Sequence, residues 1–517
     1  MNAYDLCAIP AAMFPDSECL VAGELRLSYG ELDAWTAAIA RRLERLAPGR
    51  VAVCDVNSAG LVALALAGWR SGRAVVPLNV RARGDELEFL VEASEPAAVF
   101  AGLRYLESVR AAAAATGAVV EAVPLSPDAL AAPGEQTPAD LDEAAVALGL
   151  FTSGSTARPK LVELSHGNLF AHVTSTTELP ADGPVGAVVV AAPLFHIAAF
   201  GSICTGLFGG RRLVLLDEFD PDAWMSAVER EQATHAFLVP TMLRRLIDSP
   251  VFAPQRLTTL QTVAYGAAPM PGQLLERVLE AFPATTGFAN AFGQTETTST
   301  VTLLSPDDHR IEGSAEEVER KRVRLRSVGR AIEGVEVAVL DENGVPCPTG
   351  TVGEVAVRGP RVMLGYAGAA SSGDAGDDGW LRTRDLGYLD DDGYLFLVGR
   401  ANDLIIRAGE NVAPAEVEAV LASHPGVADV SVAGVADEDL GERIGAVLVA
   451  RPGVTLEPSE IVAFARTRLA AFKKPEIIAV IDEIPRSPLG KVRRPLVREI
   501  LERDGVAVSP SGAIAAQ

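Results

Sequence analysis

The stretch Leu150–Lys160, LFTSGSTARPK, joins two apolar segments through a short loop rich in hydroxyl side chains and ends in a lysine. Residues 144–151 predict a buried strand, and residues 161–164 predict a second, short strand. Backbone N–H groups and hydroxyls in such a loop can surround phosphate oxygens, and a lysine adds a point charge. The stretch therefore indicates a polyphosphate site at the end of a strand.

The loop differs from the common NTPase motif G-x-x-x-x-G-K-[ST], because Lys160 follows Pro159 and precedes Leu161. An ordinary polar hairpin turn has a similar composition, since serine, threonine and glycine are general loop residues. Both interpretations stay open on this stretch alone.

The chain has 517 residues, of which 49% are hydrophobic and 22% charged, as in a globular enzyme. This length suggests about three domain-sized units, or one large α/β domain with smaller ones. A net charge of −23 makes nucleic acid an unexpected partner. An anionic ligand would have to be held by local positive groups against this negative background.

Cysteine usage and hydropathy indicate a cytoplasmic protein. No two of the five cysteines have C-x-x-C spacing, so neither a disulfide framework nor a cysteine zinc site is expected. The first ten residues lack the features of a signal peptide. Residues 183–210 carry no charge, but Pro193, His196 and six glycines interrupt them. We interpret them as a strand, a loop and a core helix, with a membrane span as the alternative.

Strands and helices alternate over residues 1–140, which predicts a parallel α/β sheet. Later strands at 185–192 and 262–265, and the segment 287–291, run into small-residue loops, which we expect to converge on one cleft. From about residue 329 to 398, short strands and Asp/Gly turns predict a small antiparallel subdomain. A separate α+β unit follows, and the tail 506–517 is expected to be disordered.

Three further clusters have chemistry suited to a nucleotide. In Phe292–Glu296 (FGQTE), the aromatic can stack on a purine, the hydroxyl can meet a phosphate and the carboxylate can hold Mg²⁺. Asp385 and Arg400 could grip ribose hydroxyls near a domain joint, and Lys491 lies on a Gly-Pro loop able to reach a distant site. The alternatives are a plain surface turn, an ion pair that fixes the joint, and a solvated basic loop.

Taken together, five motifs resemble the adenylate-forming superfamily, which includes acyl- and aryl-CoA synthetases, adenylation domains of peptide synthetases and luciferases. They are TSGSTARPK, FGQTE, RTRDLGY, GRANDLIIRAGENVAPAEVE and PLGKVRR, and the resemblance extends from about residue 20 to 500. It implies an α/β fold. A large N-terminal domain (1–400) would hold stacked mixed or parallel sheets with helices and a β-barrel-like subdomain. A small, mobile α+β C-terminal domain (401–505) would follow.

The resemblance also implies a reaction in two halves. A small carboxylic acid attacks the α-phosphate of ATP, giving an acyl-adenylate and pyrophosphate. After the C-terminal domain rotates, a thiol, usually that of CoA, displaces AMP. Catalysis of this kind rests mostly on positioning and charge stabilisation. A monomer or homodimer is expected.

Site residues follow from the resemblance by motif position. The phosphates would be bound by Thr152, Ser153, Gly154, Ser155, Thr156 and Lys160, adenine by Gly266, Ala267, Ala268 and Phe292, and ribose by Asp385 and Arg400. The catalytic residues would be Lys491, Thr295, Glu296 (also the Mg²⁺ ligand) and His196. The acid pocket would be lined by His196, Ile197, Phe200, Gly201, Tyr265, Gly266, Ala291 and Gly293. The hinge would be Asn402 and the CoA tunnel Ala408, Gly409 and Glu410.

Four positions depart from the family pattern. Ala157, Leu161 and Arg384 stand where glycine is usual, and Asn402 stands where the family has Asp or Lys. A Cβ restricts positive φ at the glycine positions. We interpret the four residues as variants that keep activity, because every charged catalytic position is filled.

The acceptor and the acid remain open. The segments AGENVAPAEVE and FKKP (472–475) resemble the CoA-ligase branch, which favours CoA. The alternatives are a carrier-protein thiol, a nitrogen nucleophile or a non-catalytic nucleotide-binding module. The small, apolar pocket favours a medium-chain or aromatic acid, and residues 195–200 contain no aspartate to hold an α-amino group.

Overall fold

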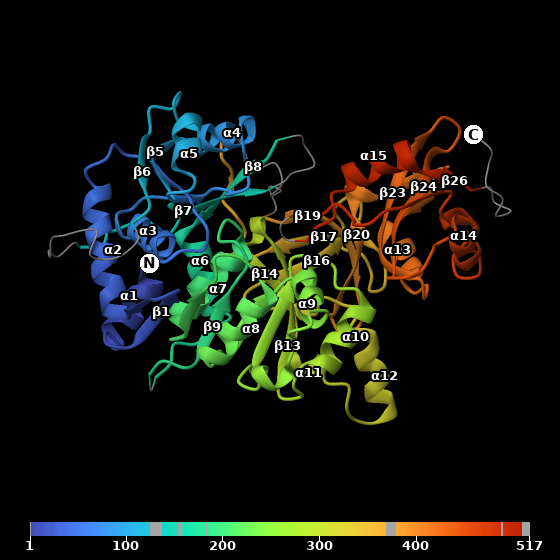
Figure 1. Ribbon diagram of the computed structural model, residues 1–517, viewed down its shortest axis with the longest axis horizontal. Helices are drawn as coiled ribbons and strands as arrows, with labels where there is room; N and C mark the ends of the chain where they lie inside the picture. Colours follow the sequence, from blue (N-terminus) through green and yellow to red (C-terminus); the bar gives the residue numbers. More distant parts are fainter. Residues whose placement is uncertain are drawn as a thin grey trace. The chain divides into compact units, whose positions relative to one another are not determined.

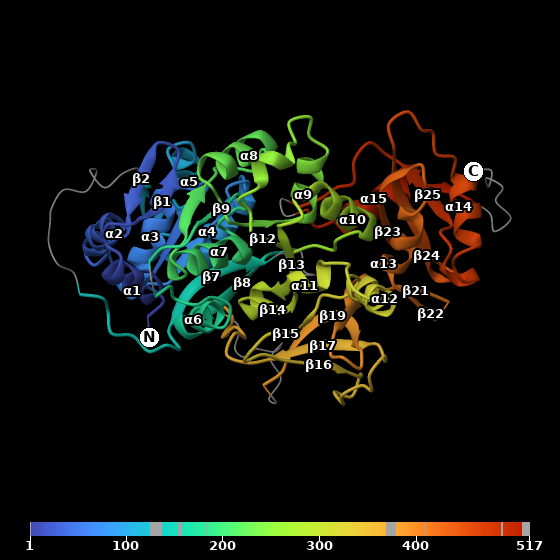
Figure 2. The ribbon, with the colours of Figure 1, turned by 90° about the horizontal axis from the view of Figure 1, so that it is seen from below.

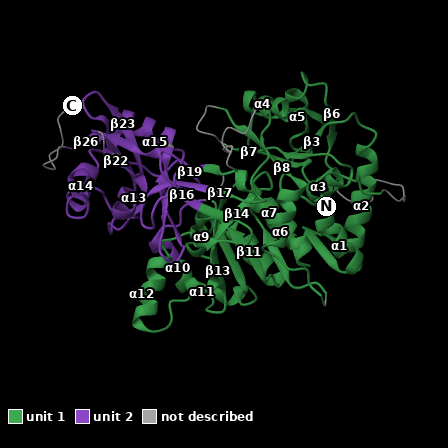
Figure 3. Ribbon diagram, turned by 180° about the vertical axis from the view of Figure 1, so that it is seen from behind, with its two compact units in different colours: residues 1–267, 278–337, 357–382 green, residues 268–277, 338–356, 383–517 purple. Residues whose placement is uncertain are grey.

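The structure, a computed structural model, describes residues 2–124, 137–152, 158–181, 183–368, 379–408, 410–487 and 490–508, except for the side chains of Asn402 and Asn411. The chain divides into two compact units (Figure 3). Unit 1 comprises Met1–Ala267, Val278–Val337 and Val357–Arg382, and unit 2 comprises Ala268–Arg277, Ala338–Ala356 and Thr383–Gln517.

Unit 1 is built on two sheets. The larger has nine strands in the order β15-β14-β13-β12-β11-β9-β10-β1-β2, with the strands from β13 to β1 parallel to one another. Its strands are β1 (Glu18–Ala22), β2 (Leu25–Ser28), β9 (Ala187–Val190), β10 (Arg212–Leu215), β11 (His235–Leu238), β12 (Thr262–Gly266), β13 (Gly287–Gln294), β14 (Ser299–Leu304) and β15 (Arg330–Ala331). The predicted parallel α/β architecture is confirmed.

The second sheet of unit 1 has seven strands in the order β18-β8-β7-β4-β3-β5-β6. They are β3 (Arg50–Cys54), β4 (Val75–Pro77), β5 (Pro96–Ala101), β6 (Val119–Ala122), β7 (Val146–Thr152), β8 (Lys160–Ser165) and β18 (Gly365–Tyr366). The strands from β7 to β6 are parallel, whereas β8 and β18 form an antiparallel edge. The quoted stretch Leu150–Lys160 therefore joins a parallel strand to the antiparallel edge.

Helices separate and flank these sheets. α6 (His166–Thr174) contacts β7 and β8 of one sheet, while α7 (Ile197–Phe208) contacts β9 and β10 of the other, and the two helices lie side by side (Figure 2). On the smaller sheet, α4 (Asp85–Ser94) and α5 (Leu106–Ala112) pack beside β5 (Figure 1). The other helices of unit 1 are α1 (Asp5–Met13), α2 (Tyr29–Leu43), α3 (Ala59–Arg70), α8 (Pro221–Arg230), α9 (Pro240–Ile247), α11 (Pro306–His309) and α12 (Ala315–Arg324).

The uncharged segment 183–210 contains β9 and α7, as the sequence predicts, and α7 packs against β9, β10 and β14. Its burial follows from its apolar residues on all sides, since such a helix belongs in a core. Within the described part of the chain, no helix combines the length and the apolar character needed to cross a membrane.

Unit 2 contains most of a four-stranded sheet and all of a second sheet. The first has the order β16-β17-β19-β20, from β16 (Glu336–Leu340), β17 (Gly353–Arg358), β19 (Leu381–Leu389) and β20 (Leu395–Arg400). In the second, β23 (Val427–Asp437) pairs along its length with β24 (Gly441–Ala450). Its other strands are β21 (Ile405–Arg407), β22 (Glu410–Val412), β25 (Ile477–Val480) and β26 (Val506–Ala507).

The helices α13 (Pro414–Ala422) and α15 (Arg494–Asp504) contact β23, and α14 (Pro458–Arg466) contacts α13, while α10 (Gly272–Ala281) spans a boundary between the units. A buried cluster around Val417, Val432 and Ile461 forms the core of the predicted α+β region. The prediction of a disordered tail is wrong for residues 506–508, because Val506–Ala507 pairs with β25 and Val508 is buried. Residues 509–517 lie outside the described part of the chain. The predicted division at residue 400 stays a prediction.

Candidate active site

Three predicted site loops of unit 1 begin at the same edge of the nine-stranded sheet. β12 pairs in parallel with β13 on one side and with β11 on the other, and β11 pairs in parallel with β9. The carboxyl ends of parallel neighbours lie together, and open α/β sheets bind their ligands there. The loops at 191–196 and 266–267 and the FGQTE segment 292–296, at the end of β13, therefore belong to one edge, as the sequence predicts.

The flanks of the hydroxyl-rich loop meet the FGQTE segment. Thr152 ends β7 and is the direct partner of Lys160 at the start of β8. The Thr152 hydroxyl donates a long hydrogen bond to Glu296, with 3.5 Å between Oγ1 and Oε1. Ser153, Gly154, Ser155, Thr156 and Ala157 lie outside the described residues. The described ends of the loop thus bring one predicted phosphate ligand to the predicted Mg²⁺ ligand.

Tyr366 is a further residue of this cluster, and the sequence alone did not single it out. Its hydroxyl donates a 3.1 Å hydrogen bond to Glu296 Oε1, and its ring centroid lies 4.5 Å from the Lys160 ammonium nitrogen. The ring lies in β18, which pairs with β8 beside the loop. The dipeptide Gly365-Tyr366 carries no chemical signature, so only the strand pairing reveals its role.

The Glu296 region suits a magnesium ion that is coordinated mainly by phosphates. Mg²⁺ usually binds to one or two carboxylates, waters and substrate phosphate oxygens. Glu296 supplies one carboxylate beside the Thr152 hydroxyl, and the Met363 N–H donates to its main-chain carbonyl at 2.9 Å. Within the described part of the chain, no cluster of three metal-binding side chains exists. This donor set fits a metal that arrives with a nucleotide rather than a resident one.

Glycines let backbone segments approach closely around the predicted acid pocket. A Cβ on Gly266 would overlap the carbonyl oxygen of Ala291, and one on Gly293 would overlap that of Ser299. Tyr265 is fully buried and its hydroxyl lies 2.8 Å from His309 Nε2. Burial raises the pKa of Tyr265, so the phenol stays protonated. The phenol is thus held by His309, while the small residues leave room where the acid pocket is predicted.

His196 stands at the N-cap of α7, at the end of the loop that follows β9. Its ring packs against Phe195, with 4.5 Å between the centroids. Asn57 holds this loop, because its amide donates to the carbonyl of Ala192 at 3.0 Å and its Oδ1 accepts from the Leu194 N–H at 2.9 Å. Asn57 thus positions the His196 loop, a role that its sequence neighbourhood does not reveal.

The surroundings of Phe292 and Thr295 are determined by the end of β13 and the turn that follows it. Phe292 is half-buried and packs against the apolar cluster of Val301, Val335 and Val357. Thr295 opens the short 3₁₀ turn Thr295–Thr297 that carries Glu296 out of the strand. The turn explains how neighbouring residues in FGQTE reach different surroundings.

In unit 2, Asp385 and Arg400 face each other across β19 and β20 and form an ion pair of 2.9 Å. Asp385 is only 5% exposed, and Thr383 Oγ1 accepts a hydrogen bond from its backbone N–H at 3.1 Å. Arg384, which lies between Thr383 and Asp385 in the chain, has a φ of 61°, in the left-handed region. The glycine that the resemblance implies at this position would adopt the conformation more easily, since a Cβ makes it costly.

Lys491 lies on an anchored hairpin of unit 2. Ser487 N–H donates to the Lys491 carbonyl at 2.7 Å, and Arg486 Nη1 donates to the Gly490 carbonyl at 2.9 Å. The same Arg486 forms a 2.9 Å ion pair with Asp429 on β23. The exposed Lys491 therefore lies on a hairpin that is held by hydrogen bonds and by the ion pair to Asp429. Pro488 and Leu489 lie outside the described residues.

Two of the predicted CoA-tunnel residues are described: Ala408 directly follows β21, and Glu410 begins β22. Ala408 has a φ of 51° and its N–H donates to the Leu440 carbonyl at 2.7 Å, while Glu410 pairs with Arg407. Gly409 and the side chain of the predicted hinge, Asn402, are outside the described part of the structure. Asn402 falls in the short 3₁₀ turn Ala401–Asp403.

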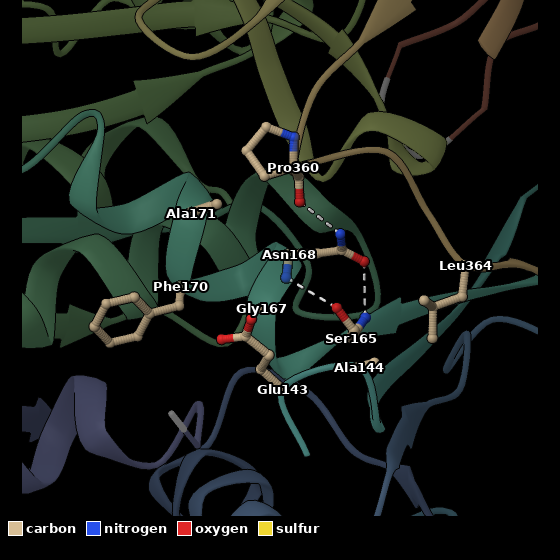
Figure 4. Close-up of a pocket in the computed structure, with 9 residues that line it drawn as sticks. All are labelled: Glu143, Ala144, Ser165, Gly167, Asn168, Phe170, Ala171, Pro360 and Leu364. Carbon is tan, nitrogen blue, oxygen red and sulfur yellow. Dashed lines mark hydrogen bonds between the residues drawn. The ribbon is translucent and has the colours of Figure 1, made fainter. Parts of the chain in front are cut away.

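A separate pocket of about 390 Å³ opens at the start of α6 (Figure 4). Its lining residues are Glu143, Ala144, Ser165, Gly167, Asn168, Phe170, Ala171, Pro360 and Leu364. The Asn168 amide donates to the carbonyls of Pro360 at 2.7 Å and Val362 at 3.0 Å, so its polar group is used within the protein. None of the predicted site residues lines this pocket.

Family comparisons place most of the chain in known domains. The AMP-binding enzyme family matches residues 8–367, and the AMP-binding enzyme C-terminal domain matches residues 416–491. A feruloyl-CoA synthase from Amycolatopsis is 35% identical, with 94% of this chain and 96% of that protein covered. The fatty acid–[acyl-carrier-protein] ligase ScoC from Streptomyces coeruleorubidus is 33% identical, with 92% and 91% covered.

Solved structures agree with this relationship. ATP-bound MatB from Rhodopseudomonas palustris superposes with a TM-score of 0.87 at 29% identity, covering 97% of this chain and 99% of that one. The amide bond synthetase McbA from Marinactinospora thermotolerans gives a TM-score of 0.85 at 30% identity, covering 96% and 99%. The fold predicted from the motifs, with a large N-terminal sheet domain and a small C-terminal domain, is confirmed. The chain belongs to the AMP-binding enzyme family, and the adenylate-forming ligase expected from its sequence motifs is confirmed.

Proposed function

We propose that this protein joins an aromatic carboxylic acid to CoA in an ATP-dependent, AMP-forming reaction. The observation that carries the proposal is the meeting of Thr152, Lys160, Glu296 and Tyr366 in unit 1. It combines hydroxyls, an ammonium group and a carboxylate, which are the groups that bind a magnesium–polyphosphate complex. The 35% identity to a feruloyl-CoA synthase supports an aryl acid and CoA.

The first step makes the acid reactive. A carboxylate oxygen attacks the α-phosphorus of ATP, the bond to the β,γ-pyrophosphate breaks, and a mixed anhydride with AMP forms. Negative charge develops on the oxygens around the α-phosphorus, so fixed positive groups lower the barrier. In this proposal Lys160 and the adjoining loop hold the β- and γ-phosphates, and Lys491 stabilises the α-phosphate and the incoming carboxylate.

Mg²⁺ would supply positive charge between the phosphates when bound with ATP. Glu296 would hold it through its carboxylate, and Thr152 and Tyr366, which both donate to Oε1, would keep that carboxylate oriented. Asp385 would accept hydrogen bonds from the ribose hydroxyls, with Arg400 fixing its orientation. Thr295, Phe292 and the Gly266–Ala268 segment would complete the nucleotide site.

The second step transfers the acyl group. The CoA sulfur attacks the carbonyl carbon of the anhydride, its proton leaves, and AMP departs with one of the original carboxylate oxygens. Ala408, Gly409 and Glu410 would line the path of the CoA arm after a rotation at Asn402. Four of the five cysteines are buried and all five are free, which fits a reducing compartment.

A second acceptor has support from two relatives. ScoC is named as a carrier-protein ligase and McbA as an amide bond synthetase. The identity of the acceptor can be tested by incubating the protein with ATP, Mg²⁺ and a panel of aryl and alkyl acids, with and without CoA. The proposal predicts pyrophosphate release with at least one acid and an acyl-CoA product. Adenylate formation without any CoA thioester, and with product on a carrier protein or an amine, would instead favour the alternative.

A further inference from the structure

Two polar side chains of unit 1 lie beside Gly201, which the sequence assigns to the acid pocket. A Cβ at position 201 would lie 2.9 Å from Nε2 of His172 and 3.8 Å from Oγ of Ser299. The three residues come from α7, α6 and the start of β14. A glycine at this point of α7 therefore leaves both polar atoms uncovered by the helix side chains.

The same corner adjoins a second pocket glycine. A Cβ on Gly293 would overlap the Ser299 carbonyl and lie 3.1 Å from Cα of Thr300. Gly293 and Thr300 are direct partners across β13 and β14. Ser299 thus stands between two predicted pocket positions, Gly201 and Gly293, and its φ of 76° holds it in a left-handed conformation.

His172 is buried, with 5% of its surface exposed, and its protonation is determined by its surroundings. Arg361 Nη1 lies 3.4 Å from Nδ1, and an arginine can only donate, so Nδ1 accepts and the proton lies on Nε2. Burial and the nearby Arg361 charge lower the pKa of His172 to about 3. At neutral pH the side chain therefore offers one N–H donor directed toward Gly201.

The guanidinium of Arg361 donates its hydrogen bonds within the protein, so it would not bind an anion itself. It is 1% exposed, and its guanidinium donates to the carbonyls of Thr300, Ala171 and His172 and to the Ser175 hydroxyl. These carbonyls include the last turn of α6, where a cation is favourable. Its effect at the corner is to orient the imidazole of His172.

In contrast, His172 Nε2 and Ser299 Oγ have no hydrogen-bond partner among the residues that the structure describes. Both atoms lie within 4 Å of the position that a Cβ of residue 201 would take, so they face the same side of Gly201 and could contact the same group of a bound acid. Neither atom is among the fully enclosed polar atoms that lack a partner, and an N–H or hydroxyl in a pocket gains free energy from a hydrogen bond to a ligand. An uncharged oxygen suits an N–H donor and a hydroxyl that can donate or accept.

We propose that His172 and Ser299 recognise an uncharged oxygen substituent, a hydroxyl or an ether, on the end of the acid remote from its carboxylate. The inference rests on the proposed function and specifies its substrate class as an oxygen-substituted aryl acid. Most of the other predicted pocket positions are apolar or small, so this corner would add a polar contact to the pocket. Sites built to bond a substrate hydroxyl discriminate strongly against the analogue that lacks it.

The test measures kcat and KM for pyrophosphate release with matched acids. Each set shares one skeleton, benzoate, arylacetate or arylpropenoate, and carries hydrogen, hydroxyl, methoxy or carboxylate at the para position. Wild type should prefer the hydroxyl or methoxy acid. His172→Leu should lower kcat/KM for that acid by about 10- to 100-fold, mostly through KM, and leave the unsubstituted acid within about twofold.

Three further variants distinguish a lost hydrogen bond to the substrate from a general loss of folding in His172→Leu. His172→Gln restores an N–H donor and should recover part of the loss, whereas Ser299→Ala should lose discrimination to a smaller degree. His235→Leu replaces a half-buried histidine of β11 that pairs with Thr234, and it should leave the preference unchanged.

The outcomes separate the two proposals. Absence of pyrophosphate release with every acid refutes the proposed function and this inference with it. Release that is fastest with unsubstituted or carboxylate-bearing acids, or an equal loss for all acids in His172→Leu, overturns only the inference.

Discussion

At the scale of single residues, the chemistry of unit 1 depends on how Glu296 is held. The hydroxyls of Thr152 and Tyr366 both donate hydrogen bonds to Oε1 of Glu296. FGQTE predicted the carboxylate, and TSGSTARPK predicted the threonine. Tyr366 could not be predicted from the residues alone, because its part depends on a strand pairing between positions about 200 residues apart in the chain. Second partners of this kind orient metal ligands.

Tyr366→Phe removes one hydrogen bond while keeping the ring that faces Lys160. Such a bond contributes about 0.5–1.5 kcal/mol, so we expect adenylation to slow by about 2- to 10-fold and the Mg²⁺ concentration for half-maximal rate to rise. The measurement is pyrophosphate release against Mg²⁺ concentration. Tyr388→Phe, whose ring stacks on Phe396, is the matched control. An unchanged Mg²⁺ requirement in Tyr366→Phe would contradict the assigned role.

Arg384 is a non-glycine residue in a left-handed backbone conformation, which strains the chain at this position. Its φ of 61° suits glycine, so Arg384→Gly should raise the free energy of unfolding by up to about 1 kcal/mol. Arg382→Gly, in the same strand and without a positive φ, should lower it by about 1 kcal/mol. Urea denaturation compares the two, and a loss of stability in Arg384→Gly equal to that of Arg382→Gly would refute the strain argument.

At the scale of elements, hydrophobic patterns predicted several of the helices and strands of unit 1. The segment Ser165-His166-Gly167-Asn168, directly after the predicted strand 161–164, is a capping box in which Ser165 Oγ accepts from the Asn168 N–H at 3.0 Å. The four-stranded sheet of the predicted antiparallel subdomain is also present. The unit boundaries could not be predicted, because they depend on which strands pair across long stretches of sequence.

The hairpin of Lys491 gives an element-level prediction. Arg486→Gln removes the ion pair to Asp429 and weakens the bond to the Gly490 carbonyl. The loop then samples more conformations, so adenylation should slow by about 10-fold because the lysine must be placed accurately. Transfer from a pre-formed acyl-adenylate to CoA should stay within about twofold.

Single-turnover assays of each half-reaction provide the measurement. Arg503→Gln breaks an exposed pair with its neighbour Asp504 and serves as the control, expected to behave as wild type in both halves. Equal slowing of both halves in Arg486→Gln would show that the hairpin serves general stability instead.

At the scale of the whole molecule, buried histidines make stability depend on pH. Burial lowers the pKa of His166 to about 4 and that of His172 to about 3, against 6.5 for an exposed histidine. Between about pH 4 and 6.5 the unfolded chain therefore binds more protons than the folded one. Stability is present above pH 6.5 and is lost as the pH falls through this window.

The expected contribution is on the order of 3 kcal/mol for His166, which is fully buried. Urea unfolding at pH 7.0 and 5.0 should show a smaller decrease for His166→Gln than for wild type. An equal decrease in both proteins would mean that His166 does not contribute to the pH dependence.

The overall assignment was accessible from sequence because five motifs in order specify one superfamily. The acid was not, since the residues proposed to contact it, such as His172 and Ser299, come together beside Gly201 only in the folded chain. A net charge of −23 also makes local cations essential, which raises the expected cost of losing Lys160 or Lys491.

The central claim is that a carboxylate oxygen of the acid forms a bond to the α-phosphate and leaves with AMP. It is tested by running the complete reaction with an acid labelled with ¹⁸O at both carboxylate oxygens and analysing the nucleotide by mass spectrometry. The account predicts one ¹⁸O in AMP, none in pyrophosphate and one in the acyl-CoA. Unlabelled AMP, or label in orthophosphate with ADP as the product, would contradict it.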